Sequence, residues 1–497
     1  MQIRAMPRLS VMRASIGQAG GIVKMGASVS AGARSEAQET KVGGGMRRIA
    51  FGLAAAVALV GIAAAVTFRP DMALRVATGF TAHTLCSWAF LDARDPGVTF
   101  REDVATEPGM GLLAPLLRFA VDRAEKEARV SVMGFFGARA RFTDGRGCRL
   151  VQGSETPLAP LLPPRSSAPP LEIDQPRPAV EAAFDRAFAS PSQGPPRHTR
   201  AIVVLRDGRI AAERYANGFS PTTVFWGHSL SKSVTHALLG ILAMAGRFDP
   251  DAPADVPEWR DAGDARATIT AGELMRMTAG FPPDETWPGW DRSSRMWFVE
   301  DDEAAFAASE QPTDKPGVAW AYHNGGVVLL SRMIRNRSGV DAQDFVRSAL
   351  FEPTGMTSAI IEADGAGTPD GSAFVWATAR DWARFGQLYL DDGVVAGRRV
   401  LPSGWAEAAA TPTVQADRGY GALFWTNRGD SAGAKQRRAE GIPADSYEAF
   451  GYEGQWVVIA PRARLVVVRL GDDWSAEHQG VPRLVGELVG AFGQNWR

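Results

Sequence analysis

Two side chains that can do chemistry together stand in the segment "GHSLSKS", residues 227–233. Ser229 and Lys232 are three residues apart, so on a helix they share one face, about one turn apart. Apolar side chains at helical spacing follow them and predict a buried helix over 233–246. Burial penalises an ammonium and lowers its pKa, and a neutral amine is the base that a serine hydroxyl needs. The segment therefore predicts a nucleophile, Ser229, activated by Lys232.

The same segment has two other interpretations. Serine is a favoured helix N-cap, and a serine and a lysine at this spacing are common, so Ser229 also fits a purely structural role. His228 is a second candidate base, although a histidine usually cannot face the hydroxyl of the serine beside it. Ser231 has no matching lysine, because the chain has Val234 three residues further on.

The composition narrows the classes of function. The 497 residues allow two or three domains, and a net charge of -1 argues against a polyanionic partner such as nucleic acid. Six histidines and two cysteines form neither a CxxC nor an HExxH pattern, so the sequence predicts no metal site. We expect an enzyme without a cofactor, and its oligomeric state is open.

An uncharged run of twenty residues, 49–68, is about as long as a helix that crosses a bilayer. Arg47 and Arg48 precede it, which favours a cytoplasmic N-terminus and an exported remainder. Segment 46–68 is therefore predicted to be a signal anchor, with a cleaved signal peptide or a buried core helix as alternatives. The protein would then be periplasmic, or held by this anchor in the inner membrane and facing the periplasm.

Two further features depend on that export. Residues 1–45 are rich in Gly, Ala and Ser and are interpreted as a disordered tail or a misassigned start. Cys86 and Cys148, the two cysteines, can pair in an oxidising compartment, or they can remain as two free buried thiols.

The rest of the chain divides by pattern. Residues 69–152 form a small exported unit, which ends in alternating apolar and polar residues around a turn at Asp144-Gly145. Residues 153–178 are Pro-rich and are interpreted as a linker. The main domain, 179–497, has strand patterns at both ends and helical patterns between them. This order predicts an α+β domain whose antiparallel sheet is built from both termini of the domain, with a helical middle.

Six segments of the main domain resemble, in order, those of one known family. They are "GHSLSKS" (227–233), "ATITAGELMRMTAGF" (267–281), "KPGVAWAYHNGGVVLLSRMIRNRSG" (315–339), "LFEPTGMTSA" (350–359), "ATARDWARFGQLYLDDG" (377–393) and "GYEGQ" (451–455). The family is that of the serine hydrolases of class C β-lactamase and penicillin-binding type, and the likeness covers about residues 180–495. The resemblance implies a β-lactamase/transpeptidase-like fold and strengthens the assignment of Ser229 as nucleophile.

The resemblance also implies roles for two residues of the Tyr-x-Asn segment. Tyr322 would relay a proton from Ser229 and later deliver it to the leaving group. Asn324 would contact the substrate and hold Lys232. In an extended segment the two side chains would face the same way. Without the family context, Tyr322 would be interpreted as a half-buried structural aromatic.

The third motif departs from the family pattern. It is Tyr452-Glu453-Gly454, where lactamases of this type have Lys-Thr-Gly and many esterases have His-x-Gly or Trp-x-Gly. Gly454 would let substrate approach the strand edge, and Gln455 would supply one backbone N–H to the oxyanion, with Ser229 supplying the other. No cation replaces the missing lysine, and Glu453 would repel a carboxylate if it faced the site.

This departure resembles the branch that contains 6-aminohexanoate-dimer hydrolases and related esterases. We therefore expect a hydrolase that cleaves carboxylic esters or small linear amides through an acyl-enzyme on Ser229. One alternative is a β-lactamase or D,D-peptidase, which the missing lysine disfavours. The other is a non-catalytic scaffold that keeps the fold.

Overall fold

The computed structural model describes residues 69–153, 158–161, 171–174, 177–190, 197–261, 263–286, 289–473 and 480–492. The predictions for 1–45, for 46–68 and for much of the linker fall outside these residues. Within the described ranges, no helix is long and apolar enough to span a membrane. All described residues belong to one compact unit.

A six-stranded antiparallel sheet, in the order β12-β13-β14-β15-β5-β6, forms the centre of the main domain. Its strands are β5 (Thr199–Arg206), β6 (Arg209–Tyr215), β12 (Trp425–Thr426), β13 (Tyr447–Gly451), β14 (Gln455–Ala460) and β15 (Leu465–Gly471). Asp207 and Gly208 both adopt positive φ, which gives the tight β5–β6 hairpin. Because β15 pairs with β5, the two ends of the domain share one sheet. The prediction of an α+β fold with an antiparallel sheet is confirmed.

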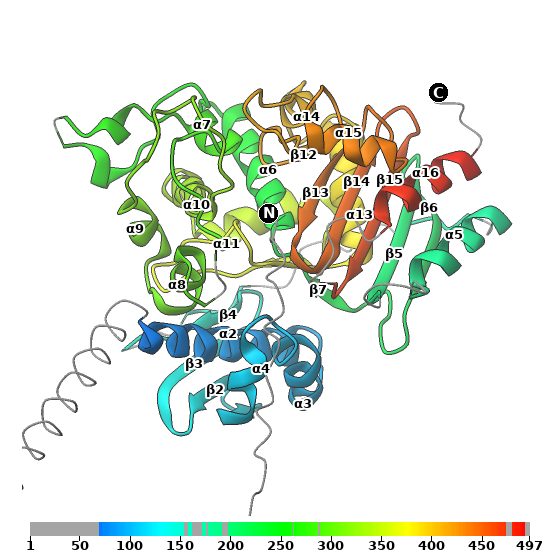
Figure 1. Ribbon diagram of the computed structural model, residues 1–497. Helices are drawn as coiled ribbons and strands as arrows, with labels where there is room; N and C mark the ends of the chain where they lie inside the picture. The colour runs from blue at the N-terminus through cyan, green and yellow to red at the C-terminus, as the bar shows by residue number, and fades with distance from the viewer. Residues whose placement is uncertain are drawn as a thin grey trace, which may run out of the picture. The chain divides into compact units, whose positions relative to one another are not determined.

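Helices cover both faces of this sheet (Figure 1). Along each strand, alternate residues face opposite ways: Val457 and Val466 belong to the core beneath α6 and α13, and Val458 and Val467 to the core beneath α5 and α16. The bounds of these helices are α5 (Pro178–Phe188), α6 (Leu230–Met244), α13 (Ala379–Leu390) and α16 (Val481–Ala491). Burial on both faces makes the central strands nearly continuous apolar runs.

The helical middle of the domain packs beside α6 (Figure 1). It includes α7 (Ala271–Arg276), α8 (Arg292–Val299), α9 (Glu303–Ala308), α10 (Asn324–Ser338), α11 (Ala342–Val346) and α12 (Glu352–Thr354). A three-stranded sheet joins it to the rest of the domain: β7 (Val224–Trp226), β9 (Val375–Thr378) and β8 (Ile360–Ile361). The remaining elements are α14 (Trp405–Ala410), α15 (Ala432–Ala439), β10 (Val394–Val395), β11 (Arg398–Arg399) and the short helices η3 (Pro257–Trp259), η4 (Ala265–Thr268), η5 (Arg347–Phe351) and η6 (Tyr452–Gly454).

The 69–152 unit combines one long helix with a four-stranded antiparallel sheet in the order β1-β2-β3-β4. Its elements are α2 (Pro70–Leu91), α3 (Pro96–Thr99), η1 (Phe100–Val104), α4 (Met110–Leu113), η2 (Ala114–Leu116), β1 (Leu117–Asp122), β2 (Glu127–Val132), β3 (Phe135–Thr143) and β4 (Gly147–Leu150). A disulfide between Cys86 and Cys148 joins α2 to β4, with the two Cα atoms 6.1 Å apart.

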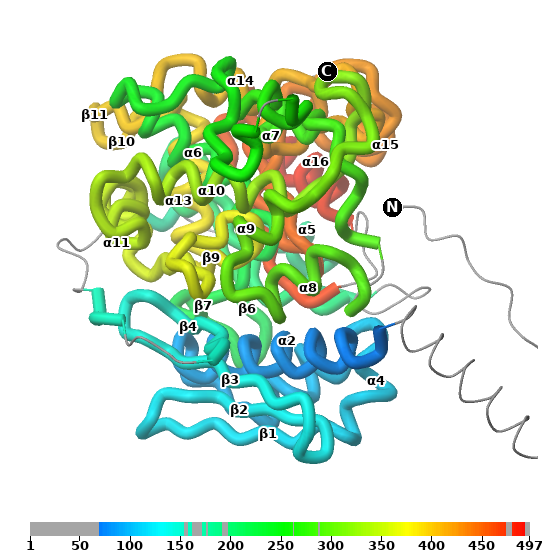
Figure 2. The backbone as a smooth tube through the Cα atoms, turned by 90° about the vertical axis from the view of Figure 1, so that its left-hand side faces the viewer, coloured from blue at the N-terminus to red at the C-terminus, as the bar shows by residue number. Residues whose placement is uncertain are grey.

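Helix α2 lies between the small sheet and the main domain (Figure 2) and is buried along most of its length. One carboxylate of the main domain, Glu362, binds both this helix and β4: Ser87 Oγ of α2 donates to it at 2.8 Å, and the Cys148 backbone N–H of β4 donates at 2.6 Å. His83 Nε2 lies 2.9 Å from the same carboxylate. The 69–152 unit is therefore packed into the folded core of this protein and is not a separate module.

Replacing both cysteines by alanine (Cys86→Ala with Cys148→Ala) should lower the free energy of unfolding by about 4 kcal/mol, because the crosslink removes loop-closure entropy from the unfolded chain. The two residues are 62 apart in sequence. Urea unfolding followed by tryptophan fluorescence measures the loss. Wild type treated with dithiothreitol should lose the same amount, whereas the double variant should not respond to the reductant. A loss below about 1 kcal/mol would show that α2 packing alone fixes the unit.

Candidate active site

Ser229 stands at the N-cap of α6, directly after β7. Between β7 and Ser229 the backbone passes close to the Trp382 ring at Gly227. A Cβ on Gly227 would lie 2.4 Å from that ring, so no other residue fits there without a shift. Lys232 Nζ donates to Ser229 Oγ at 2.9 Å and to the Ser372 carbonyl at 2.7 Å. Ser229 is half-buried and Lys232 only 2% exposed, so the hydroxyl remains reachable while the amine does not.

The electrostatics of Lys232 suit a base. Burial lowers the pKa of its amine to about 8, and the nearby carboxylates of Glu285, Asp284 and Asp370 act in the opposite direction. At neutral and mildly alkaline pH part of Lys232 is therefore neutral, and a neutral amine 2.9 Å from Ser229 Oγ is close enough to accept its proton.

Tyr322 completes a cluster of three. Its hydroxyl hydrogen-bonds to Ser229, and Lys232 Nζ lies 4.8 Å from its ring centroid. Burial and the charge of Glu285 raise the pKa of Tyr322 well above its usual value, so it is a neutral phenol that can donate a proton. Its ring stacks on Trp425 at 5.9 Å, which holds it in place. The structure thus brings together Ser229, Lys232 and Tyr322.

Asn324 differs from the expectation. It is the first residue of α10, so the extended geometry expected for residues 322–324 ends at His323, the N-cap. The Asn324 amide donates to Glu285 at 2.8 Å, and to Asp284 at 3.2 Å. Its buried Oδ1 has no hydrogen-bond partner, so Asn324 does not hold Lys232.

Glu285 and Asp284 are acidic neighbours of the cluster that the sequence analysis missed. Asp284 accepts from the Asn324 and Gly325 backbone N–H groups, at 3.0 and 2.9 Å, and so fixes the loop against the start of α10. Glu285 is open to solvent, yet the surrounding protein still desolvates it enough to raise its pKa. The signal in the sequence was an acidic pair inside a Pro- and Trp-rich loop, and nothing in that pattern points at Lys232.

Another buried acid, Asp370, shapes the other side of Lys232. It accepts from the Ser372 backbone N–H at 2.6 Å, from Ser372 Oγ at 2.5 Å and from the Ala373 N–H at 3.2 Å. These bonds hold the tight turn that presents the Ser372 carbonyl to Lys232. Trp297 Nε1 donates to Ser372 Oγ at 3.0 Å and closes the same turn.

The third motif lies elsewhere than predicted. A Cβ on Gly454 would lie 2.4 Å from Arg469 Nη1, so the prediction that Gly454 opens the strand edge to substrate is wrong. Gln455 lies on β14, and its side chain donates to the Gly471 carbonyl at 2.8 Å. The residue beside the nucleophile is Gly451 at the end of β13, where a Cβ would lie 3.2 Å from the Ser229 nitrogen and 2.4 Å from the Gly227 oxygen.

Glu453 and His228 pair with each other. His228 Nε2 lies 3.2 Å from Glu453 Oε2, and its ring stacks on Trp226 at 3.9 Å. His228 therefore faces away from the Ser229 hydroxyl and is not its base. Glu453 is turned toward His228, and the carboxylate with the largest electrostatic effect on Lys232 is that of Glu285.

No metal centre competes with this cluster in the part of the chain that the structure describes. Those residues contain no group of three or more His, Cys, Asp or Glu side chains placed to hold a metal ion. The chemistry available at the site is that of a hydroxyl, an amine and a phenol in mutual contact.

Comparisons with known proteins show which family and which proteins this chain resembles. The family model described as Beta-lactamase matches residues 184–488. The 6-aminohexanoate-dimer hydrolase of Paenarthrobacter ureafaciens is 26% identical over 286 residues, 55% of this chain and 72% of the relative. Penicillin-binding protein 4 of Amycolatopsis lactamdurans is 30% identical over 242 residues, 40% of this chain and 62% of the relative. A penicillin-binding protein homolog from Caulobacter crescentus shares the fold, with a TM-score of 0.51 and 20% identity over 63% of this chain and 96% of that one.

The pH dependence of hydrolysis should report on Lys232. Because only the neutral amine accepts a proton, kcat/KM should rise with pH through a midpoint near 8. Glu285→Gln removes a charge that favours the ammonium, so the midpoint should move down by about one pH unit. Rates with a p-nitrophenyl ester between pH 5 and 10 measure both midpoints. Glu125→Gln, at an exposed acid of the small unit, should leave the profile unchanged. An upward or absent shift in Glu285→Gln would contradict this assignment.

Proposed function

Because this chain belongs to the Beta-lactamase family, we propose that it is a serine hydrolase that cleaves carboxylic esters or small linear amides through an acyl-enzyme on Ser229. One observation carries the proposal: the buried amine of Lys232 donates to the Ser229 hydroxyl at 2.9 Å. A hydroxyl next to a depressed-pKa amine is an activated nucleophile. The name of the Paenarthrobacter ureafaciens relative supports amide chemistry.

The first half of the reaction follows from the contacts. Neutral Lys232 takes the Ser229 proton as the oxygen attacks the carbonyl carbon. The Ser229 backbone N–H and the N–H of Tyr452, the residue after Gly451, stabilise the negative charge on the carbonyl oxygen. As the tetrahedral intermediate collapses, Tyr322 gives its proton to the leaving alcohol or amine, and the Lys232 ammonium replaces that proton.

The second half runs the same transfers with water. Lys232 and Tyr322 together accept a proton from a water molecule, whose oxygen attacks the acyl carbon. The intermediate then expels Ser229 Oγ, which takes back a proton and leaves a carboxylic acid. The same three side chains serve both halves, as an acyl-transfer site requires.

The charges around the site favour neutral or cationic substrates. The segment 447–455, which holds Gly451 and Tyr452, contains no lysine or arginine, and the acid with the largest electrostatic effect on Lys232 is the exposed Glu285. A β-lactam or a D-alanyl peptide would bring a carboxylate close to this acid, which would repel it. This observation ranks the β-lactamase and D,D-peptidase alternatives below esterase or amidase activity.

Export to the periplasm, either free or held by the predicted 46–68 anchor, is part of this proposal. The Cys86–Cys148 disulfide supports it, because such crosslinks form and persist in oxidising compartments. Substrates would then be small esters or amides outside the cytoplasm.

A fluorophosphonate should form one covalent adduct, and peptide mass mapping should place it on Ser229. Ser229→Ala should show no adduct and should lower kcat for p-nitrophenyl butyrate by at least about 10³-fold, because the nucleophile is lost. Ser348→Ala, at an exposed serine of the helical middle, should label and turn over as wild type does. Full activity in Ser229→Ala would refute the acyl-enzyme.

Substrate charge should set the order of turnover. Among p-nitrophenyl esters of similar length, we expect kcat/KM to be about tenfold lower for an anionic succinyl ester than for the neutral butyryl ester, because Glu285 repels it. A 4-aminobutyryl ester should match or exceed the neutral one. Glu285→Gln should narrow the gap between the three substrates. Faster turnover of the anionic ester, or turnover of nitrocefin, would favour the lactamase alternative.

A further inference from the structure

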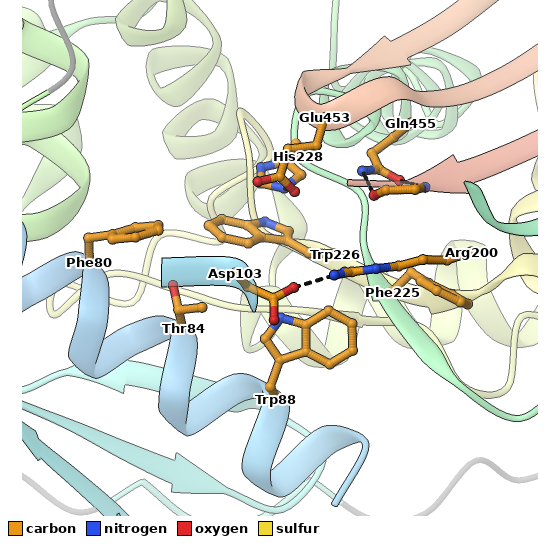
Figure 3. Close-up of a pocket in the computed structure, with 11 residues that line it drawn as sticks. Phe80, Thr84, Trp88, Asp103, Arg200, Phe225, Trp226, His228, Glu453 and Gln455 are labelled. Atoms are coloured by element: carbon orange, nitrogen blue, oxygen red, sulfur yellow. Dashed lines mark hydrogen bonds and ion pairs between the residues drawn. The ribbon is translucent and has the colours of Figure 1, made fainter. Parts of the chain in front are cut away.

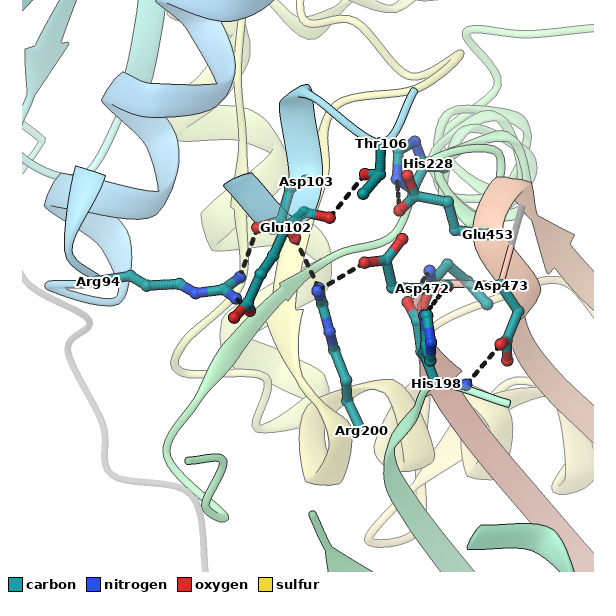
Figure 4. A network of polar contacts seen from close by, with 12 residues as sticks. Arg94, Glu102, Asp103, Thr106, His198, Arg200, His228, Glu453, Asp472 and Asp473 are labelled. Atoms are coloured by element: carbon teal, nitrogen blue, oxygen red, sulfur yellow. Dashed lines mark hydrogen bonds and ion pairs between the residues drawn. The ribbon is translucent and has the colours of Figure 1, made fainter. Parts of the chain in front are cut away.

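The 69–152 unit reaches the back of the proposed site through a chain of ion pairs (Figure 4). Arg94 and Arg200 both bind Asp103, at 2.8 Å each. Arg200 also binds Asp472 of the main domain at 2.8 Å. All four groups are largely buried, so the pairs hold the segment 92–107 rigidly against the loop that follows β15.

Glu107 extends this contact to the turn 452–454. The Tyr452 hydroxyl donates to Glu107 Oε2 at 3.1 Å, and the Glu107 carboxyl hydrogen-bonds to Glu453. Burial and the adjacent charge of Glu453 raise the pKa of Glu107 well above its usual value, and Asp472 adds to this effect. A hydrogen bond between two carboxyl groups needs one proton, and the directions of the two pKa shifts assign that proton to Glu107, which donates to Glu453.

Glu453 is the ionised partner. Burial acts to raise its pKa, but His228, the hydrogen bond from Glu107 and the charge of Arg200 outweigh that effect and hold the pKa to about 2. Its backbone adopts a left-handed conformation, with φ of 61°, which a glutamate seldom takes without support. Arg469 Nη1 donates to the neighbouring Gly454 carbonyl at 2.8 Å and braces the same turn.

His228 transmits this support to the nucleophile. It also has a positive φ, 48°, and it immediately precedes Ser229. Figure 3 shows the His228 ring between Trp226 and Glu453, at a cavity lined on its other side by Phe80, Thr84 and Trp88 of α2. The turn 452–454 follows Gly451, the residue beside the Ser229 N–H. The Glu107–Glu453–His228 contacts thus brace both backbone segments that border the proposed oxyanion site.

We propose that Glu107 is a positioning residue that the 69–152 unit contributes to the hydrolase site. Its proton fixes Glu453, and Glu453 in turn fixes the left-handed turn 452–454 and His228, which set the backbone N–H groups beside Ser229. This inference rests on the proposed acyl-enzyme function. It assigns to the small unit a direct part in the geometry of the reaction.

A pair of isosteric variants tests the hydrogen bond apart from the packing. Glu107→Met keeps the side-chain length but donates nothing to Glu453, and misplaced oxyanion donors should lower kcat for p-nitrophenyl butyrate by about 10- to 100-fold, with KM within about twofold. Glu107→Gln keeps an N–H donor for Glu453 and an acceptor for Tyr452, so it should retain kcat within about threefold. Glu125→Met, an exposed glutamate of the same unit, should behave as wild type.

The rate of fluorophosphonate labelling of Ser229 should follow kcat in every variant, and thermal melts should show that the variants are folded. Wild-type kcat in Glu107→Met, or an equal loss in Glu107→Met and Glu107→Gln, would overturn the positioning role while leaving the acyl-enzyme intact. If wild type itself forms no Ser229 adduct, the proposed function fails, and this inference fails with it.

Discussion

The buried amine of Lys232 is the constraint around which the rest of the site is arranged. Lowering its pKa from 10.5 to about 8 means that the fold disfavours the ammonium by roughly 3 kcal/mol compared with water. Two acceptors offset this cost, Ser229 Oγ and the Ser372 carbonyl, and three carboxylates act on the amine from a distance. If the carboxylates were fully effective, the lysine would stay charged and could not serve as a base. If the carboxylates were absent, the pKa of Lys232 would fall further, and the amine could not keep the proton that it takes from Ser229 during turnover.

Close backbone approach is the second requirement. The start of α6 is pressed against the end of β13, where added Cβ atoms on Gly227 and Gly451 would collide with Trp382 and with the Gly227 carbonyl. Glycine at both positions lets a strand end and a helix start come near enough for two backbone N–H groups to converge. The sheet register then decides which residues stand there, because β13 pairs with β14 through Gly451 and Gln455.

Local patterns in the sequence were sufficient for the features that local physics controls. Apolar spacing located α6, and the Asp207-Gly208 pair located the β5–β6 hairpin. The Ser229–Lys232 spacing placed a hydroxyl and an amine one turn apart. Alignment with a motif was less reliable, since Gly454 matches the family pattern by position but faces Arg469. Its surroundings depend on the left-handed turn at Glu453, and no periodicity in the sequence encodes that turn.

Contacts between distant parts of the chain could not be predicted from the sequence for the same reason. Glu107 and Tyr452 are 345 residues apart, and Glu285 acts on Lys232 from an irregular loop. Asn324 was assigned its family role, but in this chain Asp284 and Glu285 engage its amide. Each of these outcomes depends on which side chains a loop delivers. A single sequence does not determine this from local propensities.

Two carboxyl pairs near Ser229 follow one electrostatic rule. Burial and Asp370 raise the pKa of Glu303 well above its usual value, so in the hydrogen bond between Glu303 and Asp370 the proton belongs to Glu303. Glu107 holds the proton in the same way in its pair with Glu453 behind His228. In each pair one acid is neutral and donates to the other. The pair therefore offers the hydrogen bonds of two carboxyl groups but has only one negative charge. A second full negative charge on the Lys232 side would raise the pKa of the base, and one on the His228 side would oppose the oxyanion that forms next to it. Each pair thus shares one proton, so carboxyl groups can support the site through hydrogen bonds without adding negative charge around Ser229, where the reaction itself creates the negative oxyanion.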